Sequence, residues 1–222
     1  IRPCVPITKA SRSANVTADI SVWSRLPTWA GTTCGPATPA PLFARTRRRL
    51  IWPPEIEARN GLFGLVPHWS ADTRITKATY NARSETVAGK PSFREAWRKA
   101  QHCIIPADAF FEPDWRSGRA VPTCIARADQ APMGLAGLWS AWRSPQGELL
   151  YSYTMLTINA AEHPLLQLMH KPQDEKRMVV ILPEDRYTAW LRADASHSGQ
   201  FLQPFPAGLL QASAPRVAGG LF

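Results

Sequence analysis

Twenty-one prolines are spread along the 222 residues of this chain, and they limit how long any regular element can be. Proline has no backbone N–H to donate, so it interrupts the interior of a helix and of a central strand. This distribution predicts many short strands and turns rather than long helices. No internal repeat and no long low-complexity linker divides the sequence. We therefore expect a single domain over residues 1–222.

Short apolar runs rich in β-branched and aromatic residues recur along the chain, and they predict strands. Turn-forming residues separate these runs, as in the segment Arg116–Arg119. The predicted strands are Leu42–Ala44, Leu50–Trp52, Leu62–Val66, His102–Ile105, Ala109–Glu112, Pro122–Ala126, Gly134–Trp139, Ser152–Asn159 and Met178–Leu182.

Short helices are predicted between the later strands. Ser92 and Glu95 form a capping-box pattern that opens a helix to about Ala100. The segment Ala161–Met169 predicts a second helix, and Pro183 begins a third as its first residue. Strands with interspersed short helices, without regular βαβ units, predict an α+β fold. We expect it to be mainly β, with mixed or antiparallel sheets that form an irregular barrel-like core and short peripheral helices.

The chain is basic, with 26 Lys and Arg against 17 Asp and Glu and a formal net charge of +9. This charge favours polyanionic partners, nucleic acid before anionic membrane, although it also serves solubility alone. Nine Trp add aromatic faces that can stack on unpaired bases, while most of them are expected in the core. No run approaches the ~20 apolar residues that span a bilayer, and Ile1–Ala30 shows no signal peptide. We expect no membrane association and a cytoplasmic, nucleoid-associated protein.

The four cysteines, Cys4, Cys34, Cys103 and Cys124, have no CxxC spacing. Their spacing predicts neither a zinc site nor a disulfide framework. Cys103 and Cys124 lie in apolar strand-like runs, where a thiol acts as a small buried hydrophobe. We expect no metal and no organic cofactor.

Three polar residues at or beside predicted strands are candidates for acid–base chemistry. Asn81 offers a donor and an acceptor, but it also fits a simple turn. Glu112 follows Phe110 and Phe111, so partial desolvation would favour its neutral form and suit a general acid; a strand-end carboxylate in water fits equally. His170 follows the second predicted helix, where it could be charged near neutral pH or act only as a cap.

Basic and aromatic residues nearby are candidates for contacts with nucleic acid. Arg83 carries a planar cation suited to bidentate phosphate contacts, or it is an ordinary surface residue. Trp69 follows a predicted strand, where it could be a stacking wedge or a lid on the core. The basic segment Arg45–Arg49 could contact phosphates or form a solvated turn.

These segments occur in an order that resembles the SOS response-associated peptidase (SRAP) family. Phe63–Trp69 is similar to the family's W-G-L-x-P-x-W segment, with Phe in place of the first Trp. Asn81–Thr86 matches N-A-R-x-E-T without a mismatch. Pro106–Glu112 is similar to the strand that ends in an aromatic–Glu pair.

The last family segment, His-x-Arg-Met-Pro, is interrupted in this chain. His170 begins it and Arg177 continues it, with Lys171–Lys176 as an apparent insertion. The resemblance runs from about Leu42 to Val217. Its most specific part is Asn-Ala-Arg-x-Glu-Thr upstream of Phe-Phe-Glu.

The resemblance implies a protein that senses abasic sites in single-stranded DNA and crosslinks to them. In this family an N-terminal cysteine, exposed by self-removal of the initiator Met, attacks the aldehyde of the open sugar and closes a thiazolidine ring. Glu112 would be the acid–base group, His170 would assist ring opening and reversal, and Asn81 would hold the N-terminal residue. The residues implied in DNA contact are Arg2, Pro67, Trp69, Arg83 and Arg177.

The start of the sequence departs from the family pattern, which opens with Met-Cys-Gly-Arg. Ile1-Arg2 aligns with Gly-Arg, which would place the nucleophilic cysteine immediately before Ile1. Cys4 is the other candidate, if cleavage after Pro3 exposed its amine. A third hypothesis is that the nucleophile has been lost.

The leading hypothesis is a monomeric SRAP-type enzyme whose partner is single-stranded DNA with abasic sites. The alternative is a non-catalytic, basic single-stranded DNA-binding module on the same fold. Formation of a covalent adduct distinguishes the two. For a peptidase that acts on other proteins, the sequence offers no Cys/His or Ser/His/Asp set beyond these residues.

Overall fold

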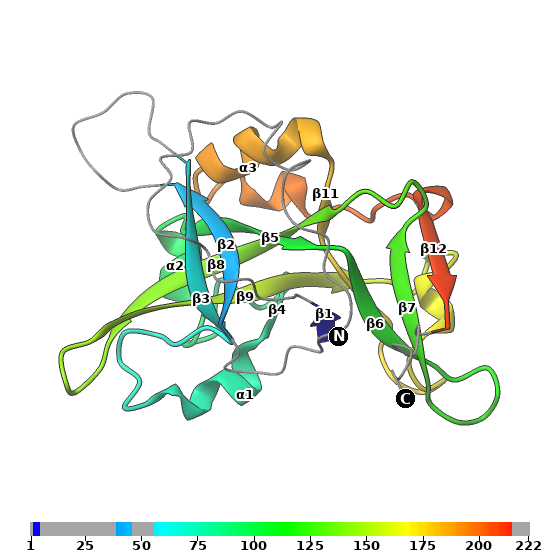
Figure 1. Ribbon diagram of the computed structural model, residues 1–222, viewed down its shortest axis with the longest axis horizontal. Coiled ribbons are helices and arrows are strands. Elements are labelled where there is room, and N and C mark those ends of the chain that lie inside the picture. Colours follow the sequence, from blue (N-terminus) through cyan, green and yellow to red (C-terminus); the bar gives the residue numbers. More distant parts are fainter. Residues whose placement is uncertain (1, 5–38, 46–55, 215–222) are drawn as a thin grey trace, which may run out of the picture.

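A five-stranded β-barrel forms the centre of the molecule (Figure 1). The computed structural model describes residues 2–4, 39–45 and 56–214. Neighbours in the order β9-β3-β2-β5-β8 are hydrogen-bonded, and β8 pairs with β9 to close the circle. All pairs are antiparallel except β3 with β9, which is parallel. The barrel strands are β2 (Pro39–Arg45), β3 (Ile56–Phe63), β5 (His102–Ala107), β8 (Met133–Arg143) and β9 (Leu149–Asn159).

Three short strands extend β8 and β9 beyond the closed barrel. β4 (Asn81–Arg83) runs parallel to β9, and β10 (Arg177–Val179) runs antiparallel to it. β11 (Ile181–Leu182) pairs with β8. Thr157 of β9 is opposite both a residue of β4 and a residue of β10, so the end of β9 lies between these two strands. Segments far apart in the sequence thus meet at one end of the barrel.

A second, four-stranded antiparallel sheet lies beside the barrel, in the order β1-β6-β7-β12 (Figure 1). Only Asp108 separates β5 from β6, so the chain passes directly from the barrel into this sheet. In the register of β1 on β6, Cys4 is opposite Ala109 and Arg2 is opposite Phe111. From Cys4 back to Arg2, β1 therefore runs toward the level of Glu112. The strands are β1 (Arg2–Cys4), β6 (Ala109–Asp114), β7 (Val121–Arg127) and β12 (Leu210–Ser213).

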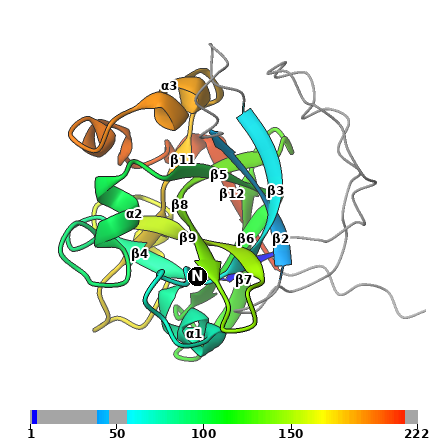
Figure 2. The same ribbon diagram turned by 90° about the vertical axis from the view of Figure 1, so that its left-hand side faces the viewer.

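Short helices pack around the outside of the barrel, with α1 (Thr76–Thr79) and α3 (Tyr187–Arg192) on opposite sides (Figure 2). α2 (Arg94–Arg98) lies at the left of the view in Figure 2, between the levels of α3 and α1. Trp190 of α3 is fully buried, and its Nε1 donates to the carbonyl of Cys103 at 2.9 Å. No helix in the described ranges is long and apolar enough to cross a membrane.

Apolar side chains fill the barrel and the space beneath α3. All six residues of β5 are buried, and so are residues 152–158 of β9. Phe63, Leu135 and Tyr153 are among the largest fully buried side chains. Strands buried on both faces give continuous apolar runs, which is why the sequence predicts them well. The predicted α+β class, mainly β with a barrel-like core and short peripheral helices, is confirmed.

Each predicted strand within the described ranges is present, although its ends differ. The strand predicted at Leu62–Val66 ends at Phe63 as part of the longer β3, and the one predicted at Met178–Leu182 is divided at Val180 into β10 and β11. The predicted strand at residues 50–52 and the basic segment at residues 46–49 lie outside the described residues.

The helix predicted at Ala161–Met169 is wrong. Only a 3₁₀ turn forms there, at Leu166–Leu168. The ring of His163 caps the start of this turn, because its Nδ1 accepts the backbone N–H of Leu165 at 3.2 Å and of Leu166 at 3.0 Å. A side chain that accepts these N–H groups caps the start of a turn, and the chain then extends toward His170 instead of continuing as a helix.

The capping box predicted at Ser92 is also wrong. Phe93 is the N-cap of α2, and no side chain caps this helix. A tight turn precedes the helix, because the carbonyl of Lys90 already accepts the N–H groups of Phe93 and Arg94 at 2.9 Å. Glu95 instead forms ion pairs with Arg98 and Lys99, one turn further along.

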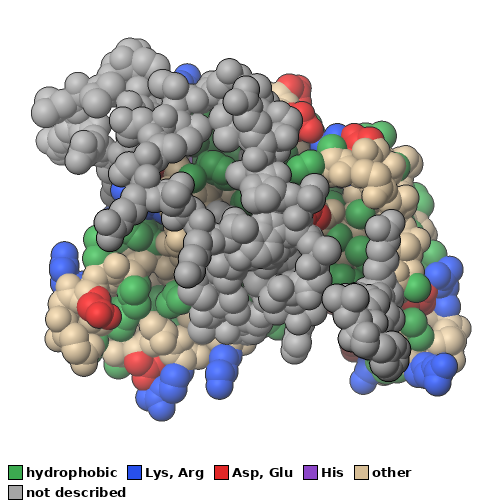
Figure 3. Space-filling view, viewed as in Figure 1, with side chains coloured by type: hydrophobic (Ala, Val, Ile, Leu, Met, Phe, Trp, Pro, Cys, Tyr) green, Lys and Arg blue, Asp and Glu red, His purple; other side chains and the backbone are tan. Residues whose placement is uncertain are grey.

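On the face shown in Figure 3, Lys and Arg side chains protrude at several separate points along the lower margin. This face alone therefore does not mark out a binding site for a polyanion.

Candidate active site

A cleft opens where β4, β9 and β10 meet. Its volume is about 620 Å³, within the range of small-ligand pockets. Thr157 of β9 lies in its wall, α1 borders one side, and the segment that leads into β10 borders the other. Its charged and polar lining includes Lys77, Asn81, Arg83, His170, Glu175 and Arg177.

Asn81 is the first residue of β4 and lines this cleft. The backbone here is fixed, because the carbonyl of Tyr80 accepts the N–H of Met155 at 3.0 Å. The Oδ1 atom of Asn81 is buried and accepts no hydrogen bond from the described residues. A buried amide oxygen without a donor is costly, so this atom is well suited to accept an N–H from a bound group.

Glu112 lies on the inner face of β6, in line with Phe110. These two residues are one strand repeat apart and both are buried, with Glu112 only 1% exposed. Burial raises the pKa of the Glu112 carboxyl to about 7. Neither of its oxygens accepts a hydrogen bond from the described residues. The group can therefore gain or lose a proton near neutral pH, as a general acid or base must.

His170 connects the cleft to Glu112. Its backbone N–H donates to the carbonyl of Pro113 at 2.8 Å, and its φ of 63° is left-handed. The Nε2 atom of its ring lies 3.2 Å from the carbonyl oxygen of Arg177 and 3.4 Å from Oε2 of Glu112. The structure thus brings Asn81, Glu112 and His170 together, while the catalytic role of each stays a prediction.

One of the two interpretations of His170, a charged ring at a helix end, is wrong in its cause and in its direction. Burial lowers the pKa of the imidazole, although the hydrogen bond with the Arg177 carbonyl partly offsets this. No α-helix ends at this residue, so no helix dipole favours the charged ring. A neutral imidazole therefore lies beside a carboxyl group that protonates easily.

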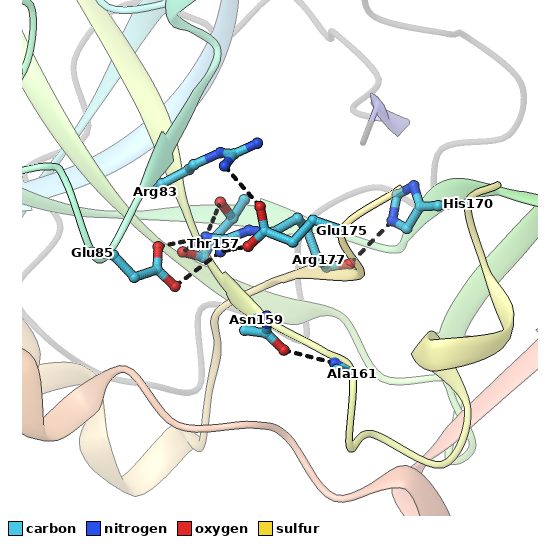
Figure 4. A network of polar contacts seen from close by, with 8 residues as sticks. All are labelled: Arg83, Glu85, Thr157, Asn159, Ala161, His170, Glu175 and Arg177. Atoms are coloured by element: carbon cyan, nitrogen blue, oxygen red, sulfur yellow. Dashed lines mark hydrogen bonds and ion pairs between the residues drawn. The ribbon is translucent and has the colours of Figure 1, made fainter. Parts of the chain in front are cut away.

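The two arginines that line the cleft are joined by the carboxylate of Glu175 (Figure 4). The buried Arg177 donates to both oxygens of Glu85, at 2.9 and 3.0 Å, and to the carbonyl of Thr157 at 2.7 Å. It also donates to Oε1 of Glu175 at 2.8 Å. The exposed Arg83 donates to Oε2 of Glu175 at 2.7 Å. Arg177 thus ties β9, β10 and the turn after β4 together, and Arg83 is the more accessible cation.

Sequence reasoning did not single out Glu85 and Glu175. Glu85 lies within the Asn81–Thr86 motif, and only its place in that motif could have identified it from the sequence. Glu175 lies in the apparent insertion, and it pairs with an arginine 92 residues away in the chain. Local patterns carry no information about such a partner.

The other residues assigned to DNA contact differ in their surroundings. Trp69 is 52% exposed, on a loop that Trp142 anchors by donating Nε1 to the carbonyl of Ser70 at 2.8 Å. Pro67 is buried. For Arg2 the structure describes the backbone in β1 and not the side chain. Contact of these residues with DNA stays a prediction.

No group of three or more His, Cys, Asp or Glu is placed to bind a metal ion in the part of the chain that the structure describes. Cys103 is fully buried, and burial raises the pKa of its thiol. A thiol in such surroundings is a poor nucleophile, so Cys103 serves packing.

A family model described as SOS response associated peptidase (SRAP) matches residues 34–216. The chain belongs to this family. The resemblance of its motifs is thus confirmed. Among solved structures, the fold of this SRAP member is similar to that of a protein from Bordetella bronchiseptica, with a TM-score of 0.75 and 45% identity over 86% of this chain and 90% of that one. A protein from Bacteroides thetaiotaomicron gives a TM-score of 0.68 at 25% identity, over 79% of this chain and 73% of that one.

Two curated relatives of this SRAP member carry functional names. The abasic site processing protein YoqW of Bacillus subtilis (strain 168) is 34% identical over 156 residues, which cover 68% of this chain and 65% of that protein. The abasic site processing protein HMCES of Gallus gallus is 31% identical over 122 residues, which cover 45% of this chain and 36% of that protein. The matched region thus spans less than two thirds of either relative.

Proposed function

We propose that this protein processes abasic sites in single-stranded DNA by forming a covalent crosslink to them. Its family and the names of its relatives support the reaction class. The observation that carries the proposal is the buried Glu112 carboxyl, with a pKa of about 7, beside His170 at the cleft. Such a group can exchange protons with a reacting sugar at neutral pH.

The proposed nucleophile is an N-terminal cysteine that removal of the initiator Met exposes. Its α-amine adds to the C1′ aldehyde of the open deoxyribose and gives a carbinolamine. Loss of one water leaves a Schiff base, and addition of the thiol to the imine carbon closes a thiazolidine ring. The sequence is a condensation, so it consumes no oxidant and no reductant.

Glu112 is the proposed proton carrier in this condensation. As a neutral acid it protonates the carbinolamine hydroxyl that leaves as water, and as a carboxylate it takes up the proton that the amine releases. The register of β1 on β6, which leads toward Glu112, supports an approach of the chain before Arg2 to this carboxyl. The buried Oδ1 of Asn81 is the proposed acceptor for an N–H of the N-terminal residue.

His170 is the proposed base for opening the sugar. Its ring is neutral because burial lowers its pKa, so it can take the proton of the C1′ hydroxyl as the C1′–O4′ bond breaks and return that proton to O4′, which becomes the free 4′-hydroxyl. Arg83 and Trp69, both exposed, are the proposed contacts to the backbone and the base stack.

Replacing Glu112 with Gln tests the assignment of this carboxyl. Gln keeps the shape of Glu but cannot carry the proton, so crosslinking of an oligonucleotide with one abasic site should slow by about 100-fold. Affinity for an unmodified single strand should stay unchanged. Denaturing gels measure the first quantity, and fluorescence anisotropy measures the second. Glu148→Gln, in the exposed β8–β9 turn, is a charge-matched control that should crosslink at the wild-type rate.

Two results would redirect the proposal. Equal loss of binding and crosslinking in Glu112→Gln would make Glu112 a structural group. Absence of any adduct in the wild-type protein, with DNA still bound, would favour a non-catalytic single-strand-binding module on the same fold.

A further inference from the structure

The segment between His170 and Arg177 forms the exposed side of the cleft. Lys171–Glu175 are all exposed, and a turn in which Asp174 donates its N–H to the carbonyl of Lys171 at 3.0 Å shapes the segment. Its ends are fixed, because the N–H of His170 binds Pro113 and the carbonyl of Lys176 accepts the N–H of Ala160 at 2.8 Å. The segment is thus an exposed loop that is held at both ends.

Glu175 is the residue through which this segment touches the cleft arginines. Its Oε2 accepts from Nη1 of Arg83 at 2.7 Å, and its Oε1 accepts from Nη1 of Arg177 at 2.8 Å (Figure 4). The hydrogen bond from Arg177 lowers the pKa of Glu175, so it is a carboxylate at neutral pH. A phosphodiester likewise has two oxygens that share one negative charge, so it can accept hydrogen bonds from the same two guanidinium groups.

We infer that the Glu175 carboxylate occupies the place of a DNA phosphate, and that the segment Lys171–Lys176 is an internal competitor which DNA must displace from Arg83 and Arg177. The inference rests on the proposed function for the identity of its ligand, single-stranded DNA. It assigns Glu175 as a residue that sets which strands the cleft accepts.

The charges of this network support competition. Arg83 and Arg177 carry two positive charges, and Glu85 and Glu175 carry two negative charges, so the closed network is neutral. When Glu175 leaves, one positive charge is uncompensated. That charge lies on Arg83, because Glu85 keeps both of its hydrogen bonds to Arg177. Opening of the segment thus gives this four-residue network a net positive charge.

Glu175 holds each arginine less firmly than Glu85 holds Arg177. Both carboxylates are partly exposed, Glu175 at 40% and Glu85 at 49%, but Glu85 accepts two hydrogen bonds from Arg177 while Glu175 accepts one from each arginine. Arg177, in contrast, remains fixed by Glu85 and by the carbonyl of Thr157 when Glu175 leaves. Arg177, one of the two cations of the proposed phosphate site, is thus already in position before DNA binds. The competitor lowers the affinity for undamaged strands, so covalent capture, rather than tight binding, would retain the protein at its target.

The experiment compares variants for binding to an unmodified fluorescent single-stranded oligonucleotide. Glu175→Gln should bind about fivefold more tightly than wild type, because DNA no longer displaces a carboxylate. Glu148→Gln makes the same change in net charge at the opposite end of β9 from Thr157, and it should bind like wild type. In an Arg83→Ala background most of the gain from Glu175→Gln should disappear, as expected for two coupled residues.

Unchanged or weaker binding by Glu175→Gln, or an equal gain from Glu148→Gln, would overturn the inference. If thermal unfolding shows that Glu175→Gln is destabilised, Glu175→Asp replaces it: this side chain keeps the charge, is too short to bridge both arginines, and should also bind more tightly than wild type. Crosslinking to an abasic oligonucleotide is measured on the same proteins. Tighter binding without any crosslink would reject the proposed function alone, and crosslinking without the gain in binding would reject the competitor alone.

Discussion

Glu112 and His170 are ionisable groups whose burial pushes both toward their neutral forms. Two charges buried side by side would carry a large desolvation cost, which this pair avoids. Burial raises the pKa of Glu112 to about 7 and lowers that of His170, so near neutral pH the carboxyl can hold a proton while the imidazole is free to accept one. A carboxyl that exchanges its proton near neutral pH can act as acid in one direction of a reversible condensation and as base in the other.

Glu112 makes the stability of the fold depend on pH. Its pKa in the folded protein, about 7, lies above the value in the unfolded chain, about 4.5. Between these values the folded state holds a proton that the unfolded state has released, so its stabilising effect is complete below about pH 4.5 and is lost as the pH rises through 7. From pH 4.5 to 8, Glu112→Gln should gain about 3 kcal/mol of unfolding free energy relative to wild type.

Urea unfolding of both proteins at the two pH values measures this gain. The gain is the change, between the two pH values, in the difference in unfolding free energy between variant and wild type. Any cost of burying the Gln amide that does not depend on pH therefore cancels. If the difference in unfolding free energy between the two proteins is the same at both pH values, the pKa of Glu112 is the same in the folded and unfolded states, and the prediction is wrong.

The chemistry of single residues was predictable where neighbours in the chain determine it. Phe110 and Phe111 made a desolvated Glu112 one of two equal interpretations, and the structure supports it by burying the carboxyl. The neutral state of His170 was not predictable, because it depends on contacts with β6 and β10. The same holds for Glu175, whose two arginine partners come from different strands.

Among the elements, strands were easier to predict than helices. The central strands carry their own apolar pattern, and their ends alone were misplaced. The helix predicted at Ala161–Met169 depended on apolar periodicity, but the backbone becomes extended at Met169 and the His170 N–H donates to Pro113 of β6, so a single 3₁₀ turn forms. Short helices gain little from their own hydrogen bonds, so tertiary contacts decide whether they form.

Gly64 joins β3 to the loop that positions α1 and Asn81. Its φ of +107° is outside the range of ordinary L-residues, and a Cβ atom there would lie 2.4 Å from the carbonyl oxygen of Thr76. Gly64→Ala should therefore lower the unfolding free energy by about 3 kcal/mol, which corresponds to a Tm lower by about 6–12 °C.

Gly118→Ala is the matched control for this prediction. Gly118 also has a positive φ, +79°, but a Cβ atom there has no atom within 4 Å. This substitution should cost only about 1 kcal/mol, from backbone strain alone. Equal shifts in Tm for the two variants, measured by calorimetry, would show that the close approach of Gly64 to Thr76 is unimportant.

At the scale of the whole molecule, the barrel brings remote segments into one cleft. Closure requires the parallel pairing of β3 with β9, and the cleft requires β4 and β10 on either side of β9. No local pattern specifies these long-range pairings, so the sequence predicted the fold class without the topology. The motif resemblance, rather than residue-level physics, predicted that Asn81, Glu112 and His170 share a site.

The net charge of +9 and the cleft cations predict salt-sensitive binding to single strands. Lys77, Arg83 and Arg177 line the cleft, and three phosphate contacts give a slope of about −2 for log K against log salt. Anisotropy titrations at several salt concentrations measure this slope. Arg83→Ala should reduce its magnitude by about 0.7. A slope near zero would show that phosphates do not contact this cleft.

The intact mass of the natively expressed protein, before and after incubation with an abasic single-stranded oligonucleotide, tests the account most directly. We expect a mature protein that begins with an exposed cysteine. We also expect a stable increase equal to the mass of the oligonucleotide less one water, as the thiazolidine condensation requires. An unchanged mass, with the DNA still bound at low salt, would contradict covalent capture and leave a non-catalytic binder of single strands.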